Sequence, residues 1–262
     1  WQREYLTGDI LNTQLSYWQN ELLEYENLNL ITDKPRPLTM DYVGANVGLK
    51  LDIITSTKLR ELAKKLGISL YSVMLGGYYL LLSAYTNQND IVIGTPATNR
   101  HHDGLDNLIG FFVNTLAMRL DIDKSKSISE YLLNVGDKVI LAQTHQDLPF
   151  EKLVSIVDVQ KDQSRSPIFQ TMFDVQSFGG GKNNDAPLFE NYHTNSDMYE
   201  IAKFDLSAII YDGGDILVGE FNYRTSLYNK DTIERLVATY IAILTNLVNV
   251  DTTVLLSQLE LV

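Results

Sequence analysis

Residues 109–115 read Ile109-Gly110-Phe111-Phe112-Val113-Asn114-Thr115, a glycine followed by an aromatic and apolar run that ends in two polar residues. The apolar character continues further along the chain and predicts a long strand over 111–122. Asn114, Thr115 and Arg119 interrupt this run, and each would need a hydrogen-bonding partner if it were buried. We therefore expect this strand to run through the core and its polar side chains to have hydrogen-bonding partners there.

Two further stretches follow in order, His145-Gln146-Asp147-Leu148-Pro149-Phe150-Glu151 and Asp162-Gln163-Ser164-Arg165-Ser166-Pro167. Asp147 and Pro149 indicate a helix start, with the carboxylate near the positive end of the helix dipole and the proline in the first turn. This predicts a helix over 150–157.

The three stretches together resemble the later core motifs of the condensation domains of nonribosomal peptide synthetases. The N-terminal residues Trp1-Gln2-Arg3-Glu4 are similar to the end of a motif that lies midway along such a domain. Lys203-Phe204-Asp205-Leu206 and Leu256-Ser257-Gln258-Leu259-Glu260-Leu261 fall where the family has its late strand and its terminus. The resemblance covers essentially all 262 residues.

Helices and strands that alternate along the chain indicate an α/β architecture with helices packed on a mixed sheet. The resemblance implies a chloramphenicol-acetyltransferase-like lobe, two of which face each other as a V in the complete domain. The family's catalytic segment, His-His-x-x-x-Asp-Gly, lies upstream of the Trp-Gln-Arg-Glu position, so we expect 1–262 to be the C-terminal subdomain. Residues 1–45 would be a linker helix and loop from the N-terminal lobe, and 46–262 the acetyltransferase-like lobe. In the family, extensions cross to the other lobe from the positions that match 94–109 and 178–197.

The spacing of apolar residues predicts the individual elements. Ser127 with Glu130 and Asp231 with Glu234 each match a capping box, which marks a helix start. The segment 70–86 is apolar nearly all round, as is typical of a buried helix, and its two glycines favour close packing. Helices are predicted over 8–26, 57–66, 70–86, 127–144, 150–157 and 231–248, and strands over 46–54, 90–95, 111–122, 168–176, 204–211 and 216–223, the last two as a hairpin.

Composition excludes several classes of function. The formal charge of −12, from 33 acidic and 21 basic residues, would repel a phosphate backbone, so we expect no nucleic-acid partner. The longest nearly apolar run, 73–85, is well short of the roughly 20 residues that cross a bilayer. The absence of cysteine excludes disulfides and thiolate zinc sites and suits the reducing cytoplasm, which we expect as the location.

The histidines do not form a catalytic constellation in the sequence. His101-His102-Asp103-Gly104 lacks the three spacer residues of the family motif, and adjacent side chains in an extended loop point apart, which favours an exposed polar loop over a catalytic pair. His145 is explained by local packing or capping near a helix boundary. We expect no catalytic residue and no metal site in this chain.

The resemblance implies that the complete domain joins two carrier-bound thioesters as an amide, and that this chain alone is inactive. Phe112, Asn114 and Thr115 would line the substrate channel, although a purely structural buried network remains open for the two polar residues. No cofactor would bind directly, but phosphopantetheine arms of carrier proteins would enter. Partners would be the N-terminal lobe, peptidyl carrier protein domains and the adenylation domain. The remaining motif residues would be structural: Arg119, Gln146, Asp147, Pro149, Arg165 and Asp205.

Two other functions stay open. The chain could be a docking and scaffolding module whose surface receives a carrier protein. It could also be a self-contained acyltransferase that uses His102 as a general base.

Overall fold

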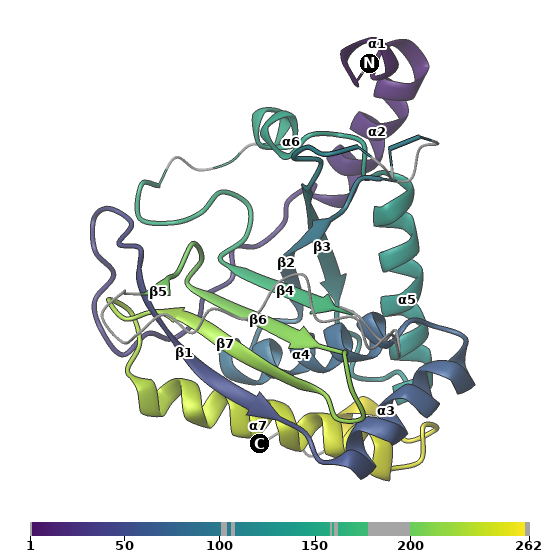
Figure 1. Ribbon diagram of the computed structural model, residues 1–262, viewed down its shortest axis with the longest axis vertical. Coiled ribbons are helices and arrows are strands. Elements are labelled where there is room, and N and C mark those ends of the chain that lie inside the picture. The colour runs from purple at the N-terminus through teal and green to yellow at the C-terminus, as the bar shows by residue number, and fades with distance from the viewer. Residues whose placement is uncertain are drawn as a thin grey trace.

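The computed structural model describes residues 2–100, 104–105, 108–157, 159, 162–177 and 200–259 (Figure 1). His102 and the predicted crossing segment 178–197 lie outside these residues. The described part contains one mixed sheet with the strand order β3-β2-β4-β6-β7-β1-β5. Pairs β2–β4 and β4–β6 are parallel, and the other pairs are antiparallel. The strands are β1 (Val43–Lys50), β2 (Asp90–Ala97), β3 (Asn114–Asp121), β4 (Thr171–Gln176), β5 (Glu200–Ile201), β6 (Leu206–Tyr211) and β7 (Val218–Arg224).

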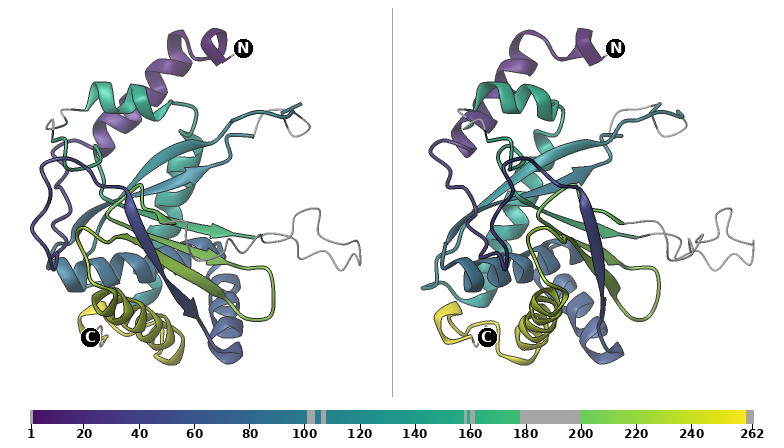
Figure 2. Two further views of the ribbon diagram at one scale, coloured as in Figure 1. Left: turned by 60° about the vertical axis from the view of Figure 1, so that its left-hand side comes forward. Right: turned by 90° about the vertical axis from the view of Figure 1, so that its left-hand side faces the viewer.

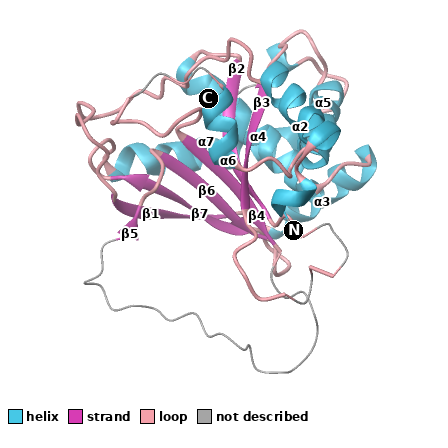
Figure 3. Cartoon of the chain, turned by 90° about the horizontal axis from the view of Figure 1, so that it is seen from above, coloured by secondary structure: helices cyan, strands magenta, loops and turns pink. Residues whose placement is uncertain are grey.

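The large helices lie on one face of this sheet, as Figure 3 shows for α3, α4, α5 and α7. In the described part of the chain no helix covers the opposite face of β1, β4, β6 and β7. Helices α1 and α2 extend from one end of the molecule, near α6 (Figure 1). The helices are α1 (Gln2–Tyr5), α2 (Gly8–Glu21), α3 (Ile53–Leu66), α4 (Leu70–Thr86), α5 (Ile128–Thr144), α6 (Phe150–Ile156), α7 (Lys230–Asn249) and the 3-10 helix η1 (Leu256–Gln258).

Helix α4 forms the centre of the core. Every residue from Ser72 to Ser83 is buried, which confirms the prediction from its all-round apolar composition. Side chains of α5 and α7 press directly on its two glycines: a Cβ at Gly76 would lie 2.7 Å from Leu132, and one at Gly77 would lie 2.6 Å from Leu244. The glycines therefore permit the close helix packing that the sequence indicated.

One predicted capping box is confirmed and the other is wrong. Ser127 and Glu130 satisfy each other's backbone donors at the start of α5. Helix α7 instead has Asn229 as its N-cap residue, and Asp231 lies inside the first turn, where it pairs with Arg235 at 3.3 Å. The capping-box spacing arises here because Asp231 and Glu234 belong to two separate surface ion pairs, Asp231 with Arg235 and Glu234 with Lys230.

The boundary between β1 and α3 differs from the prediction. A strand over 46–54 and a helix over 57–66 were expected, but α3 already begins at Ile53 because the Asp52 carboxylate accepts a hydrogen bond from Thr55 N at 2.8 Å. Ile53 and Ile54 extend the apolar alternation of β1 by chance, since both are exposed on the helix. Strand β1 also starts earlier than predicted, at Val43.

The strands β2 and β3 also have shifted ends. Strand β2 continues through Pro96 to Ala97, whereas Pro96 was expected to end it. At Pro96 the only paired neighbour among the described residues is β3, so the position that lacks an N–H can face an open edge. Strand β3 begins at Asn114 and not at Phe111, because Asn114 is the first residue with a partner on β2. Helix α2 ends at Glu21, short of the predicted residue 26, and β4, β6 and β7 each start two or three residues late.

Candidate functional site

The sheet splits open between β2 and β4. These strands share one paired position, Gly94 with Met172, whereas β2 and β3 pair along their whole length. A Cβ at Gly94 would overlap the Phe169 ring, so a glycine allows the two strands to meet at that point. Beyond it, the β2–β3 hairpin projects away from β4 (Figure 2).

The opening forms a cavity of about 460 Å³, which we call the strand gap. Its volume falls within the range of about 300–1,000 Å³ that is usual for small-molecule sites. Apolar side chains of β3 and α5 and polar groups of α4, α5, β2 and β4 contribute to its walls. It is lined by Tyr71, Thr95, Pro96, Ala97, Thr98, Arg100, Leu116, Met118, Val139, Gln143, Gln146, Asp174 and Val175.

The phenol of Tyr71 is a fixed hydrogen-bonding group in this gap. Its hydroxyl donates to Thr95 Oγ1 at 2.8 Å, and its ring packs beside Phe173 with 5.7 Å between ring centroids. Burial raises the pKa of Tyr71 above its usual value. The hydroxyl therefore stays neutral at physiological pH.

Asp174 is the carboxylate of the strand gap. Gln176 Nε2 donates to its Oδ2 at 2.8 Å. Burial raises the pKa of Asp174, while hydrogen bonds from the Gln176 side chain and the Val175 backbone partly oppose this shift. The sequence does not single out Asp174, because an acidic residue in an alternating strand is the usual sign of a solvated face.

The predicted channel residues lie next to the strand gap but do not line it. The Phe112 ring lies 4.3 Å beneath the Arg100 guanidinium, which is itself part of the lining. Leu116 and Met118 of β3 face the gap, whereas Asn114 and Thr115 are not among its lining residues. Asn114 and Thr115 therefore lie beside the strand gap and do not form its wall.

The side chain of Asn114 ties β3 to the loop between α5 and α6. Its Nδ2 donates to the carbonyls of Gln146 and Leu148, both at 2.8 Å, and its Oδ1 accepts from Phe150 N at 3.2 Å. A side chain distant in sequence thus satisfies the first backbone donor of α6. Thr115 is half-buried beside it.

Two motif residues before α6 take positions that differ from the helix-start prediction. Helix α6 does begin at Phe150, but Pro149 is its N-cap residue and does not lie in the first turn. Asp147 is buried and accepts hydrogen bonds from Tyr5 at 3.4 Å and from Gln14 at 3.5 Å. Its carboxylate thus connects the loop to α1 and α2.

Asp205 is enclosed by two guanidinium groups. Its Oδ1 accepts from Arg224 Nη1 at 3.0 Å and from Arg36 Nη1 at 3.1 Å, and its Oδ2 pairs with Arg36 Nη2. Asp205 is only 1% exposed. This cluster joins the β6–β7 pair to the chain segment before β1.

The two remaining arginines of the motifs form ion pairs away from the gap. Arg119 forks onto Asp90 with both contacts at 2.7 Å and also donates to carbonyls at the end of α2. Arg165 pairs with Asp162 at 3.5 Å and is about one-third exposed. The Arg119–Asp90 pair joins the neighbouring strands β3 and β2, and the Arg165–Asp162 pair lies within the segment before β4.

His145 is held by local contacts. Its ring stacks on Tyr17 with 3.9 Å between centroids, and its Nδ1 lies 2.8 Å from the carbonyl of Leu141. His102 lies outside the described residues. Within the described ranges, no group of three or more histidine, aspartate or glutamate side chains is placed to hold a metal ion.

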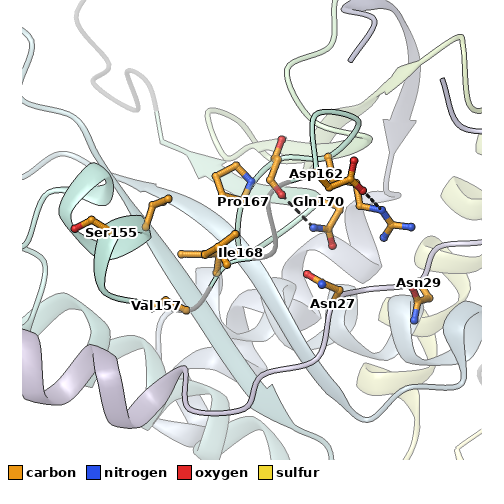
Figure 4. Close-up of a pocket in the computed structure, with 12 residues that line it drawn as sticks. Asn27, Asn29, Ser155, Val157, Asp162, Pro167, Ile168 and Gln170 are labelled. Atoms are coloured by element: carbon orange, nitrogen blue, oxygen red, sulfur yellow. Dashed lines mark hydrogen bonds and ion pairs between the residues drawn. The ribbon is translucent and has the colours of Figure 1, made fainter. Parts of the chain in front are cut away.

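A second cavity of about 640 Å³ lies beside α6 and β4 (Figure 4). Figure 4 shows Asn27, Asn29 and Gln170 on one side of it and Ser155 and Val157 on the other. Gln170 Nε2 donates to the carbonyl of Ser166 at 3.2 Å, and its buried Oε1 has no partner among the described residues. The cavity contains no catalytic pair in the described part of the chain, and no sequence motif predicts it.

The comparison with protein families identifies the class. A family model described as Condensation domain matches residues 1–262, and the chain therefore belongs to the condensation-domain family. It is 39% identical over 240 residues to N-(5-amino-5-carboxypentanoyl)-L-cysteinyl-D-valine synthase of Amycolatopsis lactamdurans, covering 92% of this chain and 6% of that protein. It is 38% identical over 251 residues to bacitracin synthase 3 of Bacillus licheniformis, and this match covers 95% of this chain and 4% of that protein. The chain thus spans a small part of these peptide synthetases.

Solved structures share the fold. A four-domain nonribosomal peptide synthetase bound to AMP and glycine superposes with a TM-score of 0.86 at 24% identity, covering 97% of this chain and 20% of that one. The X-domain from teicoplanin biosynthesis, in complex with OxyB, superposes with a TM-score of 0.86 at 23% identity. The match covers 100% of this chain and 59% of that one. The predicted acetyltransferase-like α/β fold is therefore confirmed. In the described residues no single helix is long and apolar enough to cross a membrane; only α3 and α4 together, bent by 108°, meet that test.

Proposed function

We propose that this chain is the C-terminal lobe of a peptide-bond-forming condensation domain and that its strand gap is one wall of the reaction channel. The family implies amide formation, and the relatives named above are peptide synthetases. The single observation that carries the proposal is the split between β2 and β4, since it opens a partly polar cavity between two interior strands of the sheet. The domain would act in the cytoplasm with carrier and adenylation domains as partners.

In this reaction the nitrogen of an acceptor amine attacks the carbonyl carbon of a donor thioester. The C–N bond forms, the C–S bond breaks, and the proton lost by the amine ends on the departing thiol. Orienting two tethered reactants can supply several powers of ten in rate. The chain would contribute to this orientation through its fixed polar groups, with the catalytic histidine on the other lobe.

The lining of the strand gap suits a phosphopantetheine arm, which carries an acyl group as a thioester. Such an arm contains amide groups and methylene chains. Thr95, Gln143 and Gln146 supply hydrogen-bonding groups, and Leu116 and Met118 supply apolar surface. These residues would hold the arm, while Phe112, Asn114 and Thr115 would position the neighbouring loop.

The β2–β3 hairpin supports the existence of a partner lobe. Ile109 is fully exposed, Phe111 is 92% exposed, and Leu108 and Val113 are about half exposed. Clustered apolar side chains on a projecting hairpin indicate an interaction surface. We propose that the N-terminal lobe covers them and closes the channel.

The channel assignment is tested by filling the strand gap. Gln143 is an exposed residue of α5 that lines the gap, so Gln143→Trp should obstruct it without disturbing the core. Amide formation by the synthetase that contains this chain, followed by mass spectrometry of the carrier-bound product, should fall at least about tenfold. Asp137→Trp, on an exposed position of the same helix that does not line the gap, is the control. Equal activity of both variants would contradict the assignment of the strand gap to the reaction channel.

The rival functions have their own tests. An in-frame His-His-x-x-x-Asp-Gly segment upstream of Trp1 would support the lobe assignment. Loss of acyl transfer in His102→Ala, with that segment absent, would favour a self-contained enzyme. Tight carrier binding without any effect of Gln143→Trp on amide formation would favour a docking module.

A further inference from the structure

We infer, on the basis of the proposed function, that Asp174 makes the strand gap a binding site for a primary ammonium group of the substrate. Asp174 is on β4, two residues beyond Met172, the position at which β4 leaves β2. On its other side β4 pairs with β6, where Asp174 lies opposite Ile209. The carboxylate therefore stands at the edge where the sheet opens, within the lining of the gap.

No cation of the described residues pairs with this carboxylate. Arg100 is the single Lys or Arg in the lining of the gap, and it is engaged elsewhere. Its Nη1 donates to the carbonyls of Leu105 and Leu108, and its guanidinium lies over Phe112. The polar side chain in contact with Asp174 is Gln176, a neutral donor.

The surrounding groups leave the negative charge uncompensated. The phenols of Tyr71 and Tyr211 both remain neutral, because burial raises the pKa of each. The negative charge of Asp174 adds to both shifts, since it would repel an ionised phenol. A partly desolvated carboxylate whose donors, the Gln176 amide and the Val175 backbone N–H, are both neutral is costly, and a cation that enters the gap would reduce that cost. An ammonium group is small and carries three donors, which matches a single open carboxylate.

Two parts of an acceptor substrate carry this chemistry. One is the α-ammonium of an aminoacyl thioester, which must later lose a proton to attack. The other is a side-chain ammonium of a lysine-like residue. Both would form the same charge-assisted hydrogen bond with Asp174.

Binding to the 262-residue chain tests the inference and separates the two sources. The probes are three stable analogues in which NH replaces the sulfur of the aminoacyl-pantetheine thioester, so that the acyl group is held as an amide. They carry leucyl, with an α-ammonium only; Nα-acetyl-lysyl, with a side-chain ammonium only; and Nα-acetyl-leucyl, with neither. Dissociation constants would be measured by calorimetry at pH 7 for the wild type, Asp174→Asn and Asp137→Asn. Asp137→Asn makes the same change in net charge at an exposed site outside the gap.

We expect the wild type to bind one ammonium probe at least about tenfold more tightly than the neutral probe. Asp174→Asn should abolish the difference and Asp137→Asn should keep it. The probe with the preference identifies the source. Equal binding of all three probes by the wild type, or a preference that survives in Asp174→Asn, would overturn the inference.

Urea unfolding of Asp174→Asn would verify that the variant is folded. The outcome is separate from that of the proposed function, which depends on amide formation and on Gln143→Trp. If Gln143→Trp lowers amide formation but the wild type binds all three probes equally, only the role of Asp174 is refuted. If the wild type prefers an ammonium probe but Gln143→Trp does not change amide formation, the assignment of the strand gap to the channel is refuted instead.

Discussion

Asp205 shows how much one buried carboxylate can matter to this fold. It lies between Arg36 and Arg224, and the Arg224 side chain is only 2% exposed. Asp205→Ala would leave that guanidinium buried without a counter-ion. We expect the free energy of unfolding, measured by urea denaturation, to fall by about 3–5 kcal/mol.

The control for this variant is an ion pair of the same type in solvent. Lys230 and Glu234 are 3.1 Å apart, and both side chains are at least half exposed. Glu234→Ala should cost less than about 1 kcal/mol, because water screens the pair and already solvates both charges. Comparable losses in the two variants would contradict a structural role for the Asp205 cluster.

Asn114 offers a second test at the scale of one residue. Asn114→Ala removes three hydrogen bonds to the α5–α6 connection and leaves two carbonyls and one N–H without that partner. We expect a loss of about 1–3 kcal/mol in urea denaturation. Asn134→Ala, at an exposed position of α5, should change stability by less than about 0.5 kcal/mol. An Asn114→Ala variant as stable as the wild type would instead favour a direct role toward substrate.

At the scale of an element, the two capping-box patterns predict different mutational effects. Ser127→Ala removes the hydroxyl that accepts from Glu130 N and should destabilise α5 by about 1 kcal/mol. Asp231→Ala breaks an exposed ion pair and removes a salt-screened interaction of the carboxylate with the dipole of α7, and it should cost less than about 0.5 kcal/mol at physiological salt. Thermal unfolding of both variants would show the contrast, and a larger loss in Asp231→Ala would reverse the assignment.

Strand β7 contains a carboxylate that makes stability depend on pH. Burial is the first cause that raises the pKa of Glu220, and repulsion by Glu200 adds to it. A carboxyl group whose pKa is higher in the folded state favours folding when it is protonated, so stability is lost as the pH rises through the folded pKa.

Glu220→Gln should therefore be more stable than the wild type at pH 7. The advantage should disappear below about pH 4, where the carboxyl group is protonated in both the folded and the unfolded chain. Urea denaturation across this range would check the sign. A variant that loses stability at pH 7 would mean that the hydrogen bonds of Glu220 with Asn46 and Tyr211 outweigh its desolvation.

For the whole molecule, the projecting β2–β3 hairpin predicts self-association of the isolated chain. Its tip exposes Ile109 and Phe111 with no covering element among the described residues. The double variant Ile109→Ser/Phe111→Ser should lower the concentration-dependent association measured by analytical ultracentrifugation, with the unfolding free energy unchanged within about 0.5 kcal/mol. Leu38→Ser, which replaces an exposed apolar side chain in the segment before β1, should have no such effect.

The core and most elements of this protein can be predicted from its amino-acid sequence without a structure. The all-round apolar segment at 70–86 became the central helix, and the hairpin of β6 and β7 appeared where the glycine turn was predicted. These features depend on local periodicity and on residues close together in the chain, so sequence contains them directly. The ordered motifs also indicated the family without any structural information.

What those motifs do depends on contacts that only the folded chain makes. Asn114 stands in an alternating strand, but its role is set by Phe150 and by carbonyls more than thirty residues away. By its sequence, Asp174 is an ordinary solvated strand residue. The single paired position between β2 and β4, Gly94 with Met172, shows that β4 borders an opening. Such properties arise from pairing between distant segments, because burial and hydrogen-bond partners are determined by which strands meet and where they separate.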